Sequence, residues 1–345
     1  MIGASIGPGW SMPKFVKVAL CYGMVMVGLA ATVACGATSK PMSPNDPASP
    51  LKLERRIALP DVAGHIDHLA IDLPHHILYV AEIANGTVDA VDLEAGRVVG
   101  RIAGLHEPQG IGVSTDGQQI VVACGDGTVH FYATRDRHEI ASLSLGDDAD
   151  DVRIDPRNGH AVIGYGAGGL AVIDMATLRV ISRLILPGHP EGFGLLGPRV
   201  FINIPDRGAI VEGDIDTSRI TASWPTGLHR LNFPIAVDPV KQTLAVAYRF
   251  PSALQFRSAH DGTVQATVGA CGDADDTFFD GDHIYLVCGG GYVDVRSTVH
   301  PEASAQRVKT SPGARTGLFA PELKTLFVAT PARGESAAIW VLHIF

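Results

Sequence analysis

The stretch DADDVRID at residues 148–155 returns as DADDTFFD at residues 273–280, and looser copies of it divide the chain into equal parts. Each copy starts with a polar cluster and continues as an alternating segment that ends at a turn. The other five copies are HIDHLAID from His65, EPQGIGVS from Glu107, HPEGFGLL from His189, LNFPIAVD from Leu231 and GARTGLFA from Gly313. The seven starts lie 40 to 42 residues apart. A fixed period of this length indicates a repeat architecture.

Each copy is followed by further strand-like segments separated by Gly-rich turns, such as ILYVAEI at residues 77–83. Four short strands at this period are typical of the blade of a β-propeller. The last copy has only three such segments before the chain ends, and LKLERRIAL at residues 51–59 stands before the first copy. We therefore predict an all-β, seven-bladed β-propeller of four-stranded antiparallel blades over residues 51–345. Its N-terminal strand would complete the last blade and so remove an unpaired edge.

The residues of the first blade also carry a family resemblance. Leu78-Tyr79-Val80-Ala81, followed by NGTV at residues 85–88, resembles the YVTN repeat of bacterial propellers. Residues 51–345 as a whole resemble the YncE-like, seven-bladed YVTN group. This resemblance implies the fold and not a reaction, because similar-looking propellers include lactonases, a streptogramin lyase and amine dehydrogenase subunits.

Composition excludes several classes of protein. The 345 residues are 46% hydrophobic and 18% charged, which is too apolar for a disordered chain. Lys and Arg number 27 against 36 Asp and Glu, which gives a formal net charge of −9. Binding to nucleic-acid phosphates needs a basic surface, so the charge disfavours nucleic acid as a partner.

The N-terminus is typical of an exported protein. Lys14 and Lys17 precede an uncharged apolar run that ends in small residues near residue 34. This run is shorter than the roughly 20 residues of a membrane-spanning helix, and its layout is that of a secretory signal. We therefore expect residues 1–34 to be a secretory signal and the protein to be periplasmic, or anchored on the periplasmic side of the membrane.

The segment after this signal has two features. Cys35 ends the sequence TVAC, which resembles a bacterial lipoprotein box. Lipidation at Cys35 and ordinary cleavage before it both stay open. Residues 35–50 are rich in Pro and Ser, and we expect them to form an extended tether.

Ionisable residues gather where the first strand of each blade begins. First strands line the central channel of a propeller, so the third residue of each copy joins one ring. From blade one to blade seven the ring consists of Asp67, Gln109, Asp150, Glu191, Phe233, Asp275 and Arg315. His65 and His189 start their copies on the same rim. Four carboxylates in a narrow ring repel one another unless something offsets their charge.

Three interpretations of this ring stay open. A divalent cation could be held by Asp67, Asp150, Glu191 and Asp275; oxygen ligands favour calcium or magnesium, whereas added imidazoles favour a transition metal. The channel could instead be hydrated, with its acids hydrogen-bonded to neighbouring blades. An anionic ligand could also be held by Arg315. The candidate ligand-binding residues are His65, Asp67, Gln109, Asp150, His189, Glu191, Asp275 and Arg315.

The two DADD segments suggest a structural role. Strand alternation points Asp150 and Asp275 in one direction and Asp151 and Asp276 in the other. Facing carboxylates could act as general acid and base, but blades three and six are nearly opposite in a ring of seven, which would place these residues too far apart for that. We therefore favour hydrogen bonding between blades.

Three cysteines follow the signal and Cys35, namely Cys124, Cys271 and Cys288. They lack the paired C-x-x-C spacing of a structural zinc site. An oxidising compartment allows one disulfide, and the expected strands make Cys271–Cys288 the best candidate pair.

Two functions are compatible with these observations. The first is an exported scaffold whose channel rim binds a small molecule, a metal or an envelope protein. The second is a metal-dependent, lactonase- or lyase-like enzyme with the rim as its active site. We favour the scaffold, because the sequence contains no nucleophile elbow, P-loop or H-E-x-x-H motif. We expect a monomer.

Overall fold

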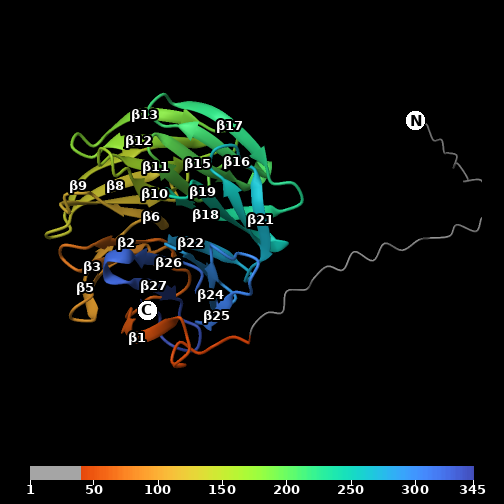
Figure 1. The fold of residues 1–345 in the computed structure, drawn as a ribbon. Coiled ribbons are helices and arrows are strands. Elements are labelled where there is room, and N and C mark those ends of the chain that lie inside the picture. The colour runs from red at the N-terminus through yellow and green to blue at the C-terminus, as the bar shows by residue number, and fades with distance from the viewer. Residues whose placement is uncertain (1–39) are drawn as a thin grey trace, which may run out of the picture. The chain divides into compact units, whose positions relative to one another are not determined.

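The computed structural model describes residues 40–345, which form seven four-stranded antiparallel sheets. The expected signal at residues 1–34 and the lipidation expected at Cys35 lie outside the described residues. The first strands of neighbouring sheets contact one another in chain order, and the last of them returns to the first. The sheets are therefore the blades of a closed ring, and Figure 1 shows them following one another from β2 to β27.

The first four blades follow the repeat. Blade one consists of β2 (Leu69–Asp72), β3 (Ile77–Glu82), β4 (Thr87–Asp92) and β5 (Arg97–Ala103). Blade two consists of β6 (Pro108–Val113), β7 (Gln119–Cys124), β8 (Thr128–Ala133) and β9 (Glu139–Ser144). Blade three consists of β10 (Ala149–Ile154), β11 (Ala161–Tyr165), β12 (Gly169–Asp174) and β13 (Arg179–Ile185). Blade four consists of β14 (Phe193–Leu196), β15 (Arg199–Ile204), β16 (Ala209–Asp214) and β17 (Arg219–Pro225).

The other three blades complete the ring. Blade five consists of β18 (Arg230–Asp238), β19 (Thr243–Phe250), β20 (Ser252–Ser258) and β21 (Val264–Gly269). Blade six consists of β22 (Ala274–Asp280), β23 (His283–Cys288), β24 (Tyr292–Ser297) and β25 (Gln306–Lys309). Blade seven consists of β26 (Gly317–Ala320), β27 (Thr325–Thr330), β28 (Ala338–Ile344) and β1 (Leu51–Ala58).

The N-terminal strand closes the ring. β1 pairs antiparallel with β28, in a register that runs from Leu51 opposite Ile344 to Ala58 opposite Ala338. The prediction of seven blades closed by the leading strand is therefore confirmed. This pairing covers the backbone edge that β28 would otherwise expose.

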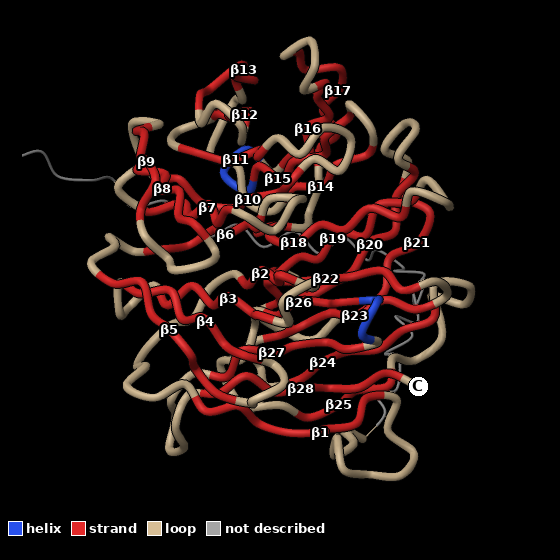
Figure 2. Tube along the Cα trace, turned by 90° about the vertical axis from the view of Figure 1, so that its left-hand side faces the viewer, coloured by secondary structure: helices blue, strands red, loops and turns tan. Residues whose placement is uncertain are grey.

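Helix is almost absent from the part of the chain that the structure describes. Only two three-residue 3-10 helices occur there, η1 (Pro205–Arg207) between β15 and β16 and η2 (Pro321–Leu323) between β26 and β27 (Figure 2). No helix among residues 40–345 has the length and apolar character needed to cross a membrane.

The apolar core lies between neighbouring blades. The second strands read as nearly continuous apolar runs; in β7, for instance, every residue after Gln119 is buried. Between blades one and two, Tyr79 of β3 packs in one cluster with Ile120 and Val122 of β7. A strand buried on both faces needs apolar residues at both alternating positions, which is why these segments do not alternate.

Part of the Pro- and Ser-rich segment is attached to blade six. Met42 forms a parallel bridge with Val308 of β25. Its N–H donates to the carbonyl of Arg307 at 2.8 Å, and its carbonyl accepts from Lys309 N at 2.9 Å. Met42 therefore lies against the propeller, a contact that the composition of residues 35–50 does not indicate.

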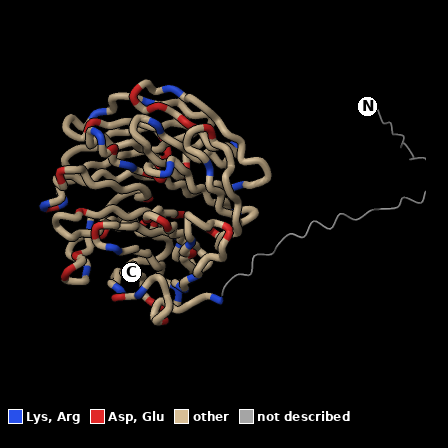
Figure 3. Tube along the Cα trace, viewed as in Figure 1, with Lys and Arg blue, Asp and Glu red and all other residues tan. Residues whose placement is uncertain are grey.

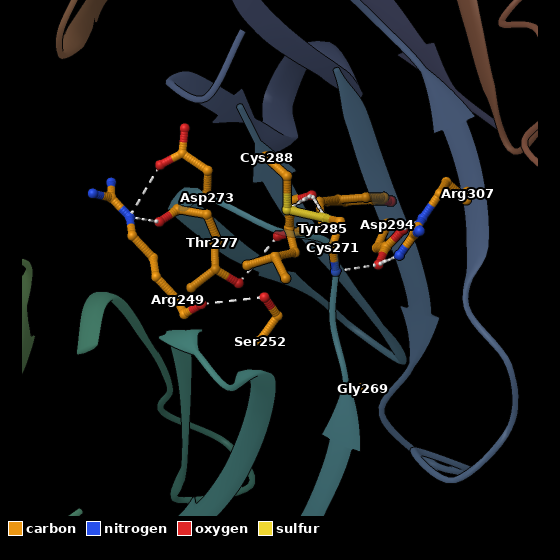
Figure 4. Close-up of a disulfide and its surroundings, with 12 residues drawn as sticks. Arg249, Ser252, Gly269, Cys271, Asp273, Thr277, Tyr285, Cys288, Asp294 and Arg307 are labelled. Atoms are coloured by element: carbon orange, nitrogen blue, oxygen red, sulfur yellow. Dashed lines mark hydrogen bonds and ion pairs between the residues drawn. A yellow bond between two sulfur atoms is a disulfide. The ribbon is translucent and has the colours of Figure 1, made fainter. Parts of the chain in front are cut away.

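A disulfide joins Cys271 to Cys288 within blade six, with 5.9 Å between their Cα atoms (Figure 4). It links the loop before β22 to the end of β23. Cys271 N also donates to Asp294 Oδ2 at 2.9 Å. Cys124 is a buried free thiol.

Candidate functional site

The structure brings the charged members of the predicted ring together at one end of the channel. We call this end, where the loops lead into the first strands, the polar rim. Carboxylates of Asp67, Asp150, Glu191 and Asp275 lie close enough for their charges to affect one another. Burial is the main reason why the pKa of each of these groups is raised, to about 7 for Asp150 and Glu191.

Two guanidiniums offset the acids of blade six. Arg249, at the end of β19, forms an ion pair with Asp275, and its Nε lies 3.3 Å from Asp273 Oδ1 (Figure 4). Arg315 Nε lies 3.4 Å from Asp275 Oδ2, and Arg315 Nη1 lies 3.4 Å from Asp273 Oδ1. Acidic and basic residues are interspersed along the rest of the described chain as well (Figure 3). Arg315 is thus already paired within the ring.

A histidine that the sequence analysis did not single out lies inside the channel. His68 follows the ring residue Asp67, and its Nε2 lies 3.9 Å from both Asp150 Oδ1 and Asp151 Oδ1. Burial lowers its pKa, but Asp151, Asp67, Asp276 and Asp150 together outweigh this and raise the pKa to about 10. At neutral pH His68 is therefore an imidazolium among carboxylates.

The acids that alternate with the ring connect neighbouring blades. Asp151 Oδ2 accepts a hydrogen bond from Phe193 N of blade four at 3.4 Å. Asp276 Oδ2 accepts one from Gly317 N of blade seven at 2.8 Å. These are the bonds between blades that the alternation of the DADD segments predicts. Burial raises the pKa of Asp276 to about 6, against the opposing effect of His68.

The two DADD segments face one cavity, although they belong to blades that are nearly opposite in the ring. Asp150 and Asp151 of blade three line the same cavity of about 40 Å³ as Asp275 and Asp276 of blade six. His68 lines it too. A volume of about 40 Å³ means that the channel is narrow here, and Gly192 and Pro234 of blades four and five also line it.

The remaining candidates lie on the polar rim with partners of their own. Gln109 Nε2 donates to Asp148 Oδ1 at 3.0 Å. His189 Nδ1 donates to the carbonyl of Gly166 at 2.7 Å. His65 Nε2 lies 4.0 Å from Asp67 Oδ1, and burial with the nearby Arg315 lowers the pKa of His65 to about 4.

The metal site predicted at Asp67, Asp150, Glu191 and Asp275 stays a prediction. Among residues 40–345, no group of three or more His, Cys, Asp or Glu side chains is arranged to hold a metal ion. Asp275 instead faces two guanidiniums, and Asp150 faces the His68 imidazolium. Charge in the ring is thus offset by side chains of the protein, which none of the three interpretations described in full.

Exposed apolar residues lie on the polar rim at blade five. Leu228 is 88% exposed, Phe250 is 70% exposed and Leu231 is exposed as well. Leu228 and Leu231 flank the start of β18, and Phe250 at the end of β19 pairs with Arg230 of β18. Arg249 covers the ring of Phe233 at 3.8 Å. We call Leu228, Leu231 and Phe250 the blade-five patch.

Comparison with known proteins shows the fold alone. The sequence matches no protein-family model, and it matches no curated protein. Similar solved structures include hydrazine synthase of Kuenenia stuttgartiensis, with a TM-score of 0.72 and 16% identity over 83% of this chain and 97% of that chain. A chain of the mitotic checkpoint complex has a TM-score of 0.73 and 16% identity, over 93% of this chain and 100% of that chain. The WD40 repeats of RRP9 have a TM-score of 0.73 and 9% identity, over 84% of this chain and 97% of that chain.

This chain is a seven-bladed β-propeller. Identities this low fix neither ligand nor reaction for the propeller. Its resemblance to the YncE-like YVTN group stays a prediction, since no family model supports it.

Proposed function

We propose that this propeller is an exported scaffold that binds an envelope protein at its polar rim. The observation that carries the proposal is the blade-five patch. Leu228 and Phe250 expose most of their side chains to solvent although apolar side chains of this size are normally buried. Exposed apolar and aromatic side chains flanked by arginine are typical of the energetically dominant part of a protein interface.

The charges around the patch favour a protein partner with acidic residues. Arg230 is exposed beside Phe250, and the Arg207 side chain is 59% exposed on the same rim. The ring acids, in contrast, are neutralised inside the channel by Arg249, Arg315 and His68. A partner would therefore meet apolar groups and exposed guanidiniums first, and a small anionic molecule would compete for the same arginines.

Site-specific crosslinking tests this interface. A photoreactive amino acid replaces Phe250 in the full chain, and a matched variant carries it at Ile181, which is exposed on the outer strand of blade three. We expect one protein to crosslink at position 250 and not at position 181. The purified partner should then bind Phe250→Asp at least about tenfold more weakly than the unmodified chain, because such truncations cost about 2 kcal/mol or more. Unchanged affinity, or equal crosslinking at both positions, contradicts the proposal.

Export is supported by residues 1–34 and needs its own test. Protease added to cells with a permeabilised outer membrane should digest the full chain but spare a variant that lacks residues 2–34. If the protease digests neither the full chain nor the variant, export is contradicted. That result would leave the proposed rim interface untouched.

The second candidate function is the metal-dependent, lactonase- or lyase-like enzyme. Its active site would need a metal held by Asp67, Asp150, Glu191 and Asp275, and among the described residues no group of three or more such side chains is arranged to hold one. Metal-dependent turnover of a lactone or ester that is lost in Asp150→Asn would replace the scaffold proposal.

A further inference from the structure

A cavity of about 760 Å³ occupies the channel on the side away from the polar rim. The first strand of every blade contributes to its wall, and it ends at His68 and Asp276. Its volume falls within the range of roughly 300–1,000 Å³ that is usual for small-molecule sites. The cavity is separate from the blade-five patch, because its other lining residues belong to the ends of the first strands and the turns that follow them.

Every blade contributes apolar residues to the wall of this cavity. The seventh residue of each eight-residue copy is apolar, from Ile71 in blade one to Phe319 in blade seven. None of these seven side chains is fully buried. Half-exposed Leu195, Phe279 and Phe319 leave apolar area in contact with the cavity, and an apolar ligand would remove that area from water.

One position of the repeat breaks this apolar wall. The sixth residue of the copies is Gly, Ala, Phe or Leu in six blades and Arg153 in blade three. Arg153 Nη1 donates to Asp151 Oδ1 and to the carbonyl of Val152, and its guanidinium lies 5.6 Å from the ring centroid of Phe193. Its side chain is 38% exposed, and its Nε and Nη2 have no hydrogen-bond partner among residues 40–345. Two donors of a permanent cation are thus free at the closed end of an apolar cavity.

The neighbouring acids, Asp151 and Asp276, already have partners in the protein and do not favour a cationic ligand. Asp151 is paired with Arg153 and accepts from Phe193 N, and Asp276 accepts from Gly317 N. A cationic head group would also meet His68 and Arg153 directly. Arg153 presents a guanidinium edge with two free donors at this end, and such an edge matches a carboxylate.

We propose that this channel cavity is a second binding site, for a molecule that has an apolar chain or ring and a single carboxylate. The carboxylate would accept hydrogen bonds from Nε and Nη2 of Arg153. The apolar body would extend along Leu195, Phe279 and Phe319 toward the open end of the cavity.

Isothermal titration of the full chain with decanoate tests the site. Decanoate should bind with one molecule per chain, whereas acetate and decyltrimethylammonium at the same concentration should not bind. Arg153→Gln should weaken decanoate binding about tenfold, as expected for the loss of a charge-assisted pair. Arg179→Gln, on the outer strand of the same blade, should leave binding unchanged.

A second variant keeps the test decisive if Arg153→Gln fails to fold. Ala236 lines the cavity from blade five, and Ala236→Trp places an indole in the cavity while keeping both members of the ion pair of Arg153 with Asp151. Decanoate binding should be lost in Ala236→Trp. Saturable decanoate binding that survives in this variant, equal binding of decyltrimethylammonium, or no binding of decanoate to the unmodified chain would each overturn the proposal. None of these results bears on the rim interface.

Discussion

His68 Nε2 of blade one lies 3.9 Å from Asp151 Oδ1 of blade three, although blade two separates these blades in the ring. The imidazole thus reaches across the channel. Because Asp151 also accepts a hydrogen bond from Phe193 N, His68 is linked to a contact between blades three and four. The interior of the ring is held by charges as well as by the apolar cores between blades.

Removing the imidazolium should destabilise the fold. His68→Gln leaves Asp150 without its cation, since Asp151 keeps Arg153, and breaking a buried ion pair on one side typically costs about 3 kcal/mol or more. Urea unfolding at neutral pH measures this loss of unfolding free energy. His260→Gln, an exposed histidine in the turn after β20, is the control and should change stability little. Equal stability of the two variants would contradict the role given to His68.

The stability of the protein should fall as the pH rises above about 6.5. The pKa of His68 is about 10 in the folded protein and about 6.5 in an unfolded chain. The folded state therefore binds the proton of His68 more tightly than the unfolded state does. The stability that this binding contributes is fully present below pH 6.5 and is lost as the pH approaches 10. Asp150 and Glu191, with pKa values raised to about 7, act in the same direction between about pH 4 and 7. Urea unfolding from pH 6.5 to 9.5 should show a steeper decline for the unmodified protein than for His68→Gln. Parallel declines would exclude His68 as the cause.

The bond between blades six and seven should depend on an acceptor at position 276. Asp276→Ala removes the partner of Gly317 N and should cost about 1–3 kcal/mol of unfolding free energy. Asp276→Asn keeps a side-chain oxygen and should cost clearly less. Thermal and urea unfolding distinguish the two variants. If both cost the same, the charge of Asp276 and not its hydrogen bond is what matters.

The disulfide of blade six should stabilise the protein. It joins residues 17 apart, and closing a loop of this size contributes roughly 3 kcal/mol in the chain-entropy account. Dithiothreitol should therefore lower the melting temperature of the unmodified protein but not that of the Cys271→Ser, Cys288→Ser double variant. Thiol labelling after denaturation should find both cysteines blocked. Free labelling of both would contradict the bond.

Sequence periodicity predicted the architecture because every blade repeats the same local pattern. The third residue of each copy could be placed on the channel without coordinates, so the charged members of the ring from Asp67 to Arg315 were anticipated. The closure by residues 51–59 followed from counting strands, and β1 pairs with β28 as expected.

Charge pairing in the channel could not be predicted in the same way. His68 stands at a position where other copies have Gly, Asp, Pro or Thr, so the repeat gives no expectation for it. Its approach to Asp150 and Asp151 depends on how far its side chain reaches across the channel. The spacing of the sequence repeat does not give the width of that channel. The cavity around Arg153 was missed for a related reason: apolar residues at the ends of first strands look identical whether they face a core or a channel.

The ionisation state of His68 is the most direct test of this account. Nuclear magnetic resonance of the full chain with labelled histidine, assigned with His68→Gln, reports whether its ring nitrogens carry one proton or two. A ring that stays doubly protonated at pH 8 and titrates near pH 10 is the predicted result. A ring that titrates near its ordinary pKa of about 6.5 would contradict the claim that an imidazolium offsets the channel acids.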